Sequence, residues 1–116
     1  MRICFTGGRH YNGSAMALFV LDLLRETDPS AELHVGDCPT GLDEMIRDLA
    51  QLNPDRVWKA DWTKHKLAAG PIRNREMLMG NGHKADLLIA FPGKDGTENC
   101  VSQALQLGIP MLRVPF

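Results

Sequence analysis

Glycine-bearing loops that follow strand-like segments are the first candidates for chemistry in this sequence. Gly7-Gly8-Arg9 is the first loop, G-D-C-P-T-G-L-D at residues 36–43 the second, and F-P-G-K-D-G-T at residues 91–97 the third. Each of them precedes a segment with helical periodicity. Glycine lets backbone N–H groups approach a ligand closely, and the start of a helix favours a phosphate group. Together the loops predict a site for an anionic ligand.

Each loop also has a purely structural interpretation. Residues 7–8 fit a tight turn, and they do not form the G-x-G-x-x-G dinucleotide fingerprint. Thr40 and Asp43 fit a capping box, in which both side chains satisfy free N–H groups of the following helix. Residues 92–96 fit ordinary turn chemistry. If all three loops lie at the same edge of a β-sheet, that arrangement would favour the ligand-binding interpretation over these structural ones.

The segment A-G-P-I-R-N-R at residues 69–75 adds two arginines and an asparagine at the start of a predicted helix. The helix dipole disfavours cations there, so these side chains are better explained as donors to phosphate or sugar oxygens. Residues two apart do not share a helix face, and we expect Arg73 rather than Arg75 to reach the ligand. The predicted ligand-binding residues are Gly7, Gly8, Arg9, Gly36, Asp37, Thr40, Gly41, Asp43, Arg73, Asn74, Pro92, Gly93, Gly96 and Thr97.

Carboxylates near these loops are candidates for catalysis. Cleavage of an N-glycosidic bond needs a carboxylate that steadies an oxocarbenium-like centre or activates water. Asp37 is the first candidate for that role, and Glu98 is the second. As a non-catalytic alternative, Asp37 could accept hydrogen bonds from ribose hydroxyls, as acids after a second strand do in dinucleotide folds. Trp62 could stack on a nucleobase or pack over the sheet edge, and both interpretations stay open.

Alternating strand-like and helix-like segments must position these residues. Strands are expected at residues 2–6, 32–35, 57–60, 85–91 and 111–114. Helical spacing predicts four helices between them, the third starting at Pro71 after a long loop at residues 61–70. The first helix is expected to face the core through Met16, Phe19, Val20, Leu23 and Leu24.

This alternation predicts a single α/β domain over residues 1–116, with a three-layer α/β/α architecture. Right-handed crossovers favour a five-stranded parallel sheet in the order 3-2-1-4-5. In such sheets, ligands bind at the carboxyl ends of the strands beside the point where the strand order reverses. The three loops all occupy that edge, so the candidate residues are expected to meet there.

The composition indicates which kind of partner the protein binds and where in the cell it is found. The 116 residues carry 13 basic and 14 acidic side chains, and this near-neutrality disfavours a protein that coats nucleic acid. Residues 56–84 nevertheless hold a local charge of +5, which we expect to serve one small anion. The 3 cysteines show neither C-x-x-C nor metal-ligand spacing, which predicts a cytoplasmic location and no metal site. No apolar run is long enough for a membrane span.

The motifs carry a resemblance to a known family. G-D-C-P-T-G-L-D, D-W at residues 61–62, A-G-P-I-R-N, A-F-P-G-K-D-G-T and G-I-P at residues 108–110 resemble the small YspA-like proteins of the SLOG superfamily. That superfamily also contains the DNA-processing protein DprA and the LOG-type phosphoribohydrolases. The resemblance implies a Rossmann-like domain that binds a nucleotide or a molecule related to NAD or ADP-ribose, as a sensor or carrier, with no further cofactor. It also implies a homodimer as one option.

Two other functions stay open. LOG enzymes cleave nucleoside monophosphates with an Arg and the Glu of P-G-G-x-G-T-x-x-E, whereas this chain has Lys94 at a loop glycine and Cys100 at the Glu position. An N-glycosidase of the phosphoribohydrolase type is therefore the alternative to the binding function. DprA-like binding of single-stranded DNA ranks third. Proteins of that kind stack successive bases on several aromatic side chains, whereas we expect only Trp62 in the basic segment of this chain to serve as such a platform.

Overall fold

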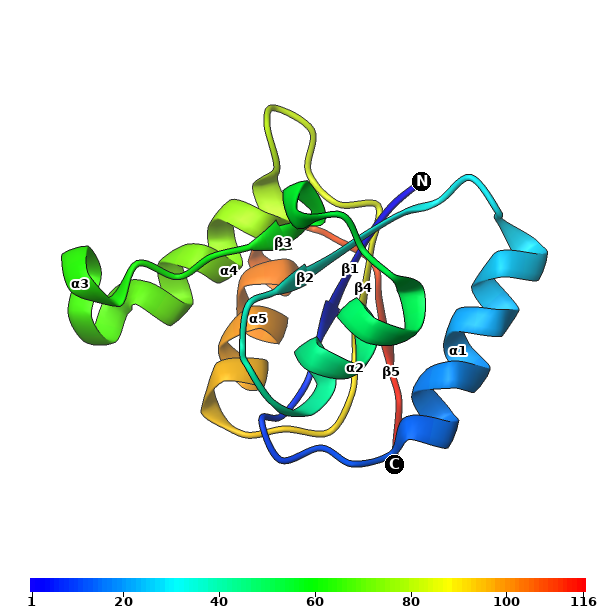
Figure 1. Ribbon diagram of the computed structural model, residues 1–116. Coiled ribbons are helices and arrows are strands. Elements are labelled where there is room, and N and C mark those ends of the chain that lie inside the picture. Colours follow the sequence, from blue (N-terminus) through cyan, green and yellow to red (C-terminus); the bar gives the residue numbers. More distant parts are fainter.

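The computed structural model describes all residues, 1–116, and contains one five-stranded sheet (Figure 1). Every neighbouring pair of strands is parallel, and the order is β3-β2-β1-β4-β5. The predicted α/β class and the predicted strand order are both confirmed. The strands are β1 (Arg2–Thr6), β2 (Glu32–Gly36), β3 (Val57–Trp58), β4 (Leu87–Ala90) and β5 (Met111–Arg113).

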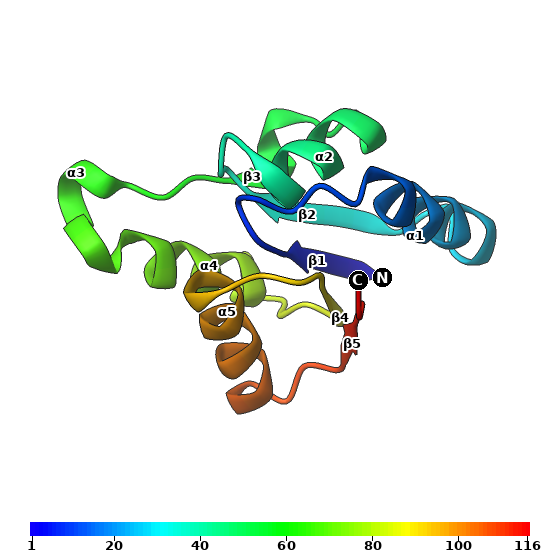
Figure 2. The ribbon, with the colours of Figure 1, turned by 90° about the horizontal axis from the view of Figure 1, so that it is seen from below.

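Helices cover both faces of the sheet. They are α1 (Ser14–Thr27), α2 (Gly41–Ala50), α3 (Trp62–His65), α4 (Ala69–Met79) and α5 (Asp95–Gln106). Figure 2 shows α1 and α2 on one face and α4 and α5 on the other, which gives the three layers. None of these helices combines the length and the apolar character that crossing a lipid bilayer would require.

The sheet is buried between two hydrophobic clusters because alternate residues of the central strands point to opposite faces. Ile3 and Phe5 of β1 pack with Leu21 and Ile46 of the α1–α2 layer. Cys4, between them in sequence, belongs to the second cluster under α4 and α5. Packing on both faces fixes the central strands, and it therefore fixes the points at which the loops at their carboxyl ends begin.

The predicted core stripe of α1 is confirmed for Met16, Val20 and Leu24, which pack on the core, but it is wrong for Phe19 and Leu23. Phe19 and Leu23 are 62% and 49% exposed, whereas Ala17 and Leu21 are buried. Seven of the eight residues in the run A-L-F-V-L-D-L-L are apolar, so two overlapping stripes fit the same spacing. The small Ala17 side chain faces the sheet and allows α1 to pack closely on it.

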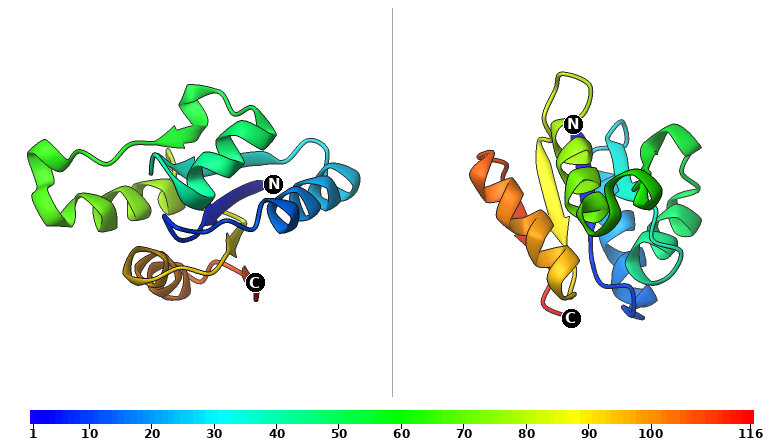
Figure 3. Two further views of the ribbon diagram at one scale, coloured as in Figure 1. Left: turned by 60° about the horizontal axis from the view of Figure 1, so that its bottom comes forward. Right: turned by 90° about the vertical axis from the view of Figure 1, so that its left-hand side faces the viewer.

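The segment between β3 and α4 also differs from the prediction. The expected loop at residues 61–70 contains α3 and a short 3₁₀ turn, Lys66–Ala68, and α4 begins at Ala69 rather than at Pro71. Proline is tolerated there because the first helical N–H groups have no intrahelical acceptor. This segment projects from the body of the molecule beside the sheet edge (Figures 1 and 3).

Strand β3 is shorter than predicted, since it ends at Trp58 instead of residue 60. The backbone N–H of Ala60 donates to Asp37 Oδ1 at 3.3 Å rather than to a neighbouring strand. Trp58 holds this short edge strand to β2, because its indole Nε1 donates to His34 Nδ1 at 3.0 Å. Hydrogen bonds that involve side chains therefore replace ladder hydrogen bonds where the chain leaves the sheet.

Gly41 provides a test of how the loops pack against each other. It has φ +70°, and a Cβ there would overlap Gly8 O and lie 2.6 Å from Arg9 Cα. Gly41→Ala should lower the free energy of unfolding by about 2–4 kcal/mol, through the left-handed backbone and the overlap together. Urea unfolding measures the loss.

Gly82→Ala is the matched control. Gly82 has φ +92°, but a Cβ there would meet nothing within 4 Å. It should cost only about 1 kcal/mol, which is the backbone contribution alone. Equal losses in the two variants would contradict the close approach of the two loops.

Candidate functional site

A pocket of about 1050 Å³ opens at the carboxyl ends of the strands. Its walls come from the loops after β1, β2 and β4 and from the first turns of α4 and α5. Two predicted residues, Thr40 and Gly41, lie outside its lining. The predicted residues that line it are Gly7, Gly8, Arg9, Gly36, Asp37, Asp43, Arg73, Asn74, Pro92, Gly93, Gly96 and Thr97.

The glycines of the first and third loops let those loops touch. Gly8 N donates to Pro92 O at 2.9 Å, and a Cβ on Gly8 would lie 3.1 Å from Gly93 Cα. A Cβ on Gly93 would overlap the Thr97 side chain, and one on Gly7 would lie 2.5 Å from Leu42 Cδ2. These glycines therefore serve the packing of the loops, which sets the shape of the pocket.

The predicted capping box at the start of α2 does not form. Thr40 makes no side-chain cap; its Oγ1 donates to Arg9 O at 2.8 Å. Asp43 Oδ2 accepts from Cys38 N at 3.1 Å, within the loop that precedes the helix. Thr40 thus ties the second loop to the first, while Asp43 stiffens the second loop from inside.

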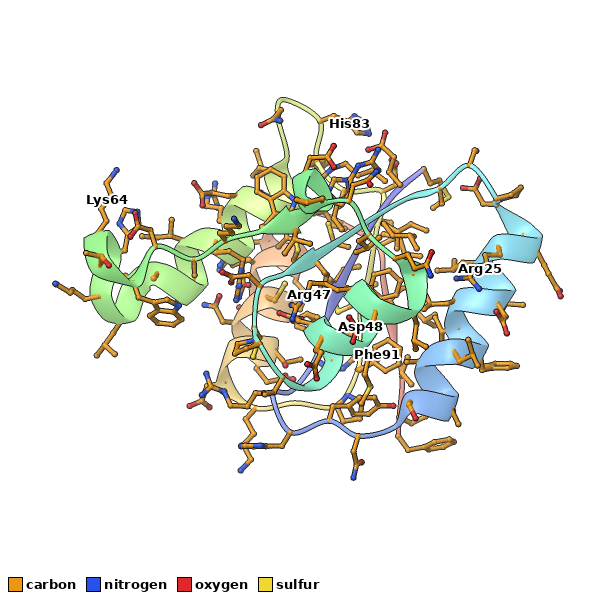
Figure 4. All side chains as sticks on the ribbon, viewed as in Figure 1. Arg25, Arg47, Asp48, Lys64, His83 and Phe91 are labelled. Carbon is orange, nitrogen blue, oxygen red and sulfur yellow. The ribbon has the colours of Figure 1, made fainter.

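Arg47 of α2 holds the same loop from the other side. Its Nη1 donates to Cys38 O at 2.8 Å and lies 3.4 Å from Gly36 O. Figure 4 labels Arg47 and its neighbour Asp48 on this helix. The loop after β2 is therefore bound to α2 through both its N–H and its C=O groups.

Arg73 joins α4 to the loop after β2. Its Nη1 donates to Asp37 Oδ1 at 2.8 Å, and its Nε donates to Asn74 Oδ1 at 3.0 Å. A Cβ on Gly36 would lie 2.6 Å from Arg73 Nη1 and 2.9 Å from Asp43 Oδ2. The guanidinium and the two carboxylates thus meet over a bare glycine, and this cluster forms part of the pocket wall.

Asn74 lines the pocket, but its side chain is directed toward other protein groups. Its side chain is buried, and its Nδ2 donates to Gly96 O at 3.3 Å and to Asn99 Oδ1 at 3.2 Å. Both ends of the carboxamide are occupied by protein groups. Asn74 therefore connects α4 to α5 and fixes the plane of the Arg73 guanidinium.

The buried Asp43 carboxyl is held in an unusual electrostatic environment. Burial raises its pKa above the ordinary value of 3.8, while the charge of Arg73 and the hydrogen bond from Cys38 N oppose that rise. Asp37 lies nearer the surface and is paired directly with Arg73. Two carboxylates of different character therefore share one cation.

The start of α5 is open toward the pocket. The N-cap Lys94 makes no side-chain cap, and Gly96 and Thr97 line the pocket. A Cβ on Gly96 would meet nothing within 4 Å. The first N–H groups of a helix lack internal partners and attract anions. Arg9 and Lys94 line the same pocket and add positive charge, whereas Asp95 reduces it.

Several pocket residues were missed from the sequence. His10, Tyr11 and Asn12 extend the wall formed by the first loop, and Cys38 and Pro39 extend the wall formed by the second. Their direct succession to Gly7-Gly8-Arg9 and to Asp37 was the available signal. Trp62 lines the pocket, and about half of its surface is exposed. This exposure disfavours the alternative in which Trp62 is buried against the sheet edge.

Other candidates lie apart from the pocket. Glu98 is outside its lining and pairs with Arg113, with Oε2 2.6 Å from Nη2. Arg75 is also outside the lining, as the choice of Arg73 over Arg75 predicts. Cys100 is buried, and burial raises its pKa to about 11, so its thiol stays protonated. No group of three His, Cys, Asp or Glu side chains converges in a way that could hold a metal ion.

Comparisons with known proteins add little to this geometry. A segment of 56 residues is 41% identical to the "Gene 61 protein" of Mycobacterium phage D29. The match covers 47% of this chain and 42% of the phage protein, whose name states no activity. No protein-family profile matches the chain, and no solved structure matches it. The functional argument therefore depends on the pocket itself.

The environment of Asp43 predicts a pH dependence. Since its folded-state pKa is raised, its favourable contribution is full below 3.8 and is lost as the pH rises through the folded-state pKa. Asp43→Asn removes this titration. The stability of the variant relative to the parent protein should therefore increase from about pH 4 to about pH 7, measured by urea unfolding.

Asp48→Asn, at an exposed position on the same helix, is the control for a general charge effect. Its stability difference from the parent protein should change less with pH. A difference for Asp43→Asn that is flat, or that falls as the pH rises, would show that burial does not dominate at Asp43.

Proposed function

We propose that this protein binds a nucleotide or a nucleotide-derived molecule of the NAD or ADP-ribose type in the pocket at the sheet edge, as a sensor or carrier. One observation carries the proposal: a single pocket joins an uncapped helix start to a fixed Arg–Asp cluster. The first attracts a phosphate, and the second offers polar partners to an uncharged part of the ligand.

The phosphate is assigned to the open start of α5. The N–H groups of Gly96 and Thr97 lie there without a side-chain cap, and Lys94 and Arg9 supply charge. The guanidinium of Arg73 is already engaged by Asp37 and Asn74, so it contributes less to phosphate binding than its sequence position suggests. This assignment leaves the cluster around Asp37 for the sugar.

Trp62 supplies a surface for the base. It lies in the projecting segment at the other side of the pocket, and its ring is near Gly70, where a Cβ would lie 3.6 Å from Cη2. A half-exposed indole can stack on a nucleobase without loss of core packing. The resemblance of the loop motifs to SLOG proteins supports the same class of ligand.

An N-glycosidase is the second candidate, and the pair Asp37 and Asp43 favours it. Glycosidases use two carboxyl groups whose different environments keep one protonated and the other charged. Here Asp43 is buried, whereas Asp37 is paired with Arg73. Incubation with ribonucleoside monophosphates and NAD, followed by chromatography, tests for release of free base. Binding without release would leave the sensor or carrier function.

Substitution at Gly96 tests the binding function. Gly96→Asp places a carboxylate in open space at the phosphate position, so it should abolish the stabilisation that nucleotides produce while the protein still folds. A ligand at a hundred times its Kd stabilises the folded state by about 2.7 kcal/mol. Thermal unfolding with AMP, GMP, CMP, UMP, NAD and ADP-ribose measures the effect.

Gly96→Ala is the matched control, because it fills the same space without charge and keeps the backbone N–H. It should retain most of the stabilisation. If none of the six compounds stabilises the parent protein, the proposed function is wrong. If Gly96→Asp responds like Gly96→Ala, the phosphate lies elsewhere.

A further inference from the structure

We propose that two copies of this chain pair through the outer face of α1 and the adjoining strand β5, with the two α1 helices antiparallel about a twofold axis. The side chains that carry the inference lie outside the lining of the pocket, so it does not depend on the proposed function.

Large apolar side chains are exposed along α1. Phe19 is 62% exposed and Leu23 is 49% exposed, and four residues separate them, so they form one stripe on the helix. Arg25 marks the flank of α1 that faces α2, because its Nη2 donates to Leu49 O at 3.1 Å. At 3.6 residues per turn, Phe19 and Leu23 lie about 120° or more around the helix from Arg25. The stripe therefore faces away from α2.

Strand β5 continues this apolar surface at the edge of the sheet. Val114 packs with Ala17 of α1, and alternate strand residues share a face, so Leu112 lies on the same side of the sheet. Leu112 is 51% exposed there. Phe116 is 71% exposed, and its carbonyl accepts from Tyr11 Oη at 3.1 Å close to the start of α1 (Figure 1). The α1–β5 patch is defined as Phe19, Leu23, Leu112 and Phe116.

The size of the α1–β5 patch fits a second copy of the chain. Its four side chains expose roughly 400 Å² of apolar surface, given their exposed fractions and the usual areas of such side chains. A standard interface buries about 800 Å² on each partner, of which about 500 Å² is apolar in homodimers. The patch therefore supplies most of the apolar centre of such an interface, and pairing would also cover an edge strand.

Charge at the two ends of α1 favours the antiparallel arrangement. The first turn of α1 carries no acidic residue and no side-chain cap. Glu26 lies in the last turn, where the helix dipole disfavours an acid, and the adjacent Arg25 pairs with Asp22 instead, at 3.2 Å. When Phe19 of one copy faces Leu23 of its partner, each Glu26 lies at the uncapped start of the partner's α1. A twofold axis forms this contact twice.

Sedimentation velocity of the full chain, from about 1 to about 300 µM, tests the inference. The chain has a mass of 12.9 kDa, and the parent protein should shift to twice that mass as its concentration rises. Phe19→Asp should weaken the association at least about thirtyfold, because it places a charge at the centre of the interface. Thermal unfolding gives a second readout: the midpoint should rise with protein concentration in the parent protein but not in Phe19→Asp.

Leu105→Asp is the matched control, since Leu105 is 65% exposed on α5, which covers the opposite face of the sheet (Figure 2). It should pair like the parent protein. Glu26→Lys tests the charge contact separately. It should stabilise the isolated helix but weaken pairing by about tenfold at low salt, because it reverses a charge at both starts of α1.

A parent protein that stays monomeric at every concentration would overturn the inference and would leave the α1–β5 patch to a different partner. Pairing that survives Phe19→Asp, or that Leu105→Asp abolishes, would place the interface elsewhere and overturn it as well. If Phe19→Asp fails to fold, the parent protein and Glu26→Lys still decide the question. None of these outcomes changes nucleotide binding, so the proposed function is tested independently.

Discussion

The guanidinium of Arg73 is the group on which the candidate site depends. It reaches from α4, on one face of the sheet, to Asp37 in the loop after β2, and Asn74 extends the same connection to α5. Without this cation, Asp37 and the buried Asp43 would repel each other across Gly36. Arg73 therefore acts mainly as a positioning residue. It keeps the Asp37 and Asp43 carboxylates in place beside the pocket and, through Asn74, links α4 to α5.

Backbone contacts between loops supply the rest of the frame. Gly8 meets the loop after β4, Gly41 meets the loop after β1, and Gly36 lies under the Arg73 guanidinium. In each case the missing side chain makes room for another protein group. Gly96 is different, because the space around it is open. Glycines in these loops thus differ in their surroundings, and the one at the start of α5 leaves open space in the pocket.

The fold could be predicted in some detail because its signals are local and repeated. The apolar run around β4 and the turns between elements predict the parallel sheet and its order. The orientation of α1 could not be predicted, since its continuous apolar run allows more than one buried face and only the packing of Ala17 distinguishes them. The short β3 depends on a hydrogen bond from Ala60 to Asp37, a contact between residues far apart in sequence.

The sequence predicts which residues line the pocket better than it predicts the contacts that each residue makes. Strand ends and glycines identify the three loops that line the pocket. Helix geometry indicates that only one of Arg73 and Arg75 faces it, and the lining contains Arg73. The partners of Arg73 and Asn74 could not be predicted, because they belong to other loops and helices that meet only in the folded chain. Trp62 lies in a segment without strong periodicity, so its place at the pocket follows from the structure alone.

Amide chemical shifts test the central claim most directly, because they report where a ligand binds as well as whether it binds. The measurement is a titration of ¹⁵N-labelled protein with ADP-ribose, NAD and the four ribonucleoside monophosphates. A phosphate at the open helix start should shift the amides of Gly96 and Thr97 most, together with Gly8 across the pocket. Spectra that no compound changes, or largest shifts on α1 and β5, would contradict the assignment of this pocket as a nucleotide site.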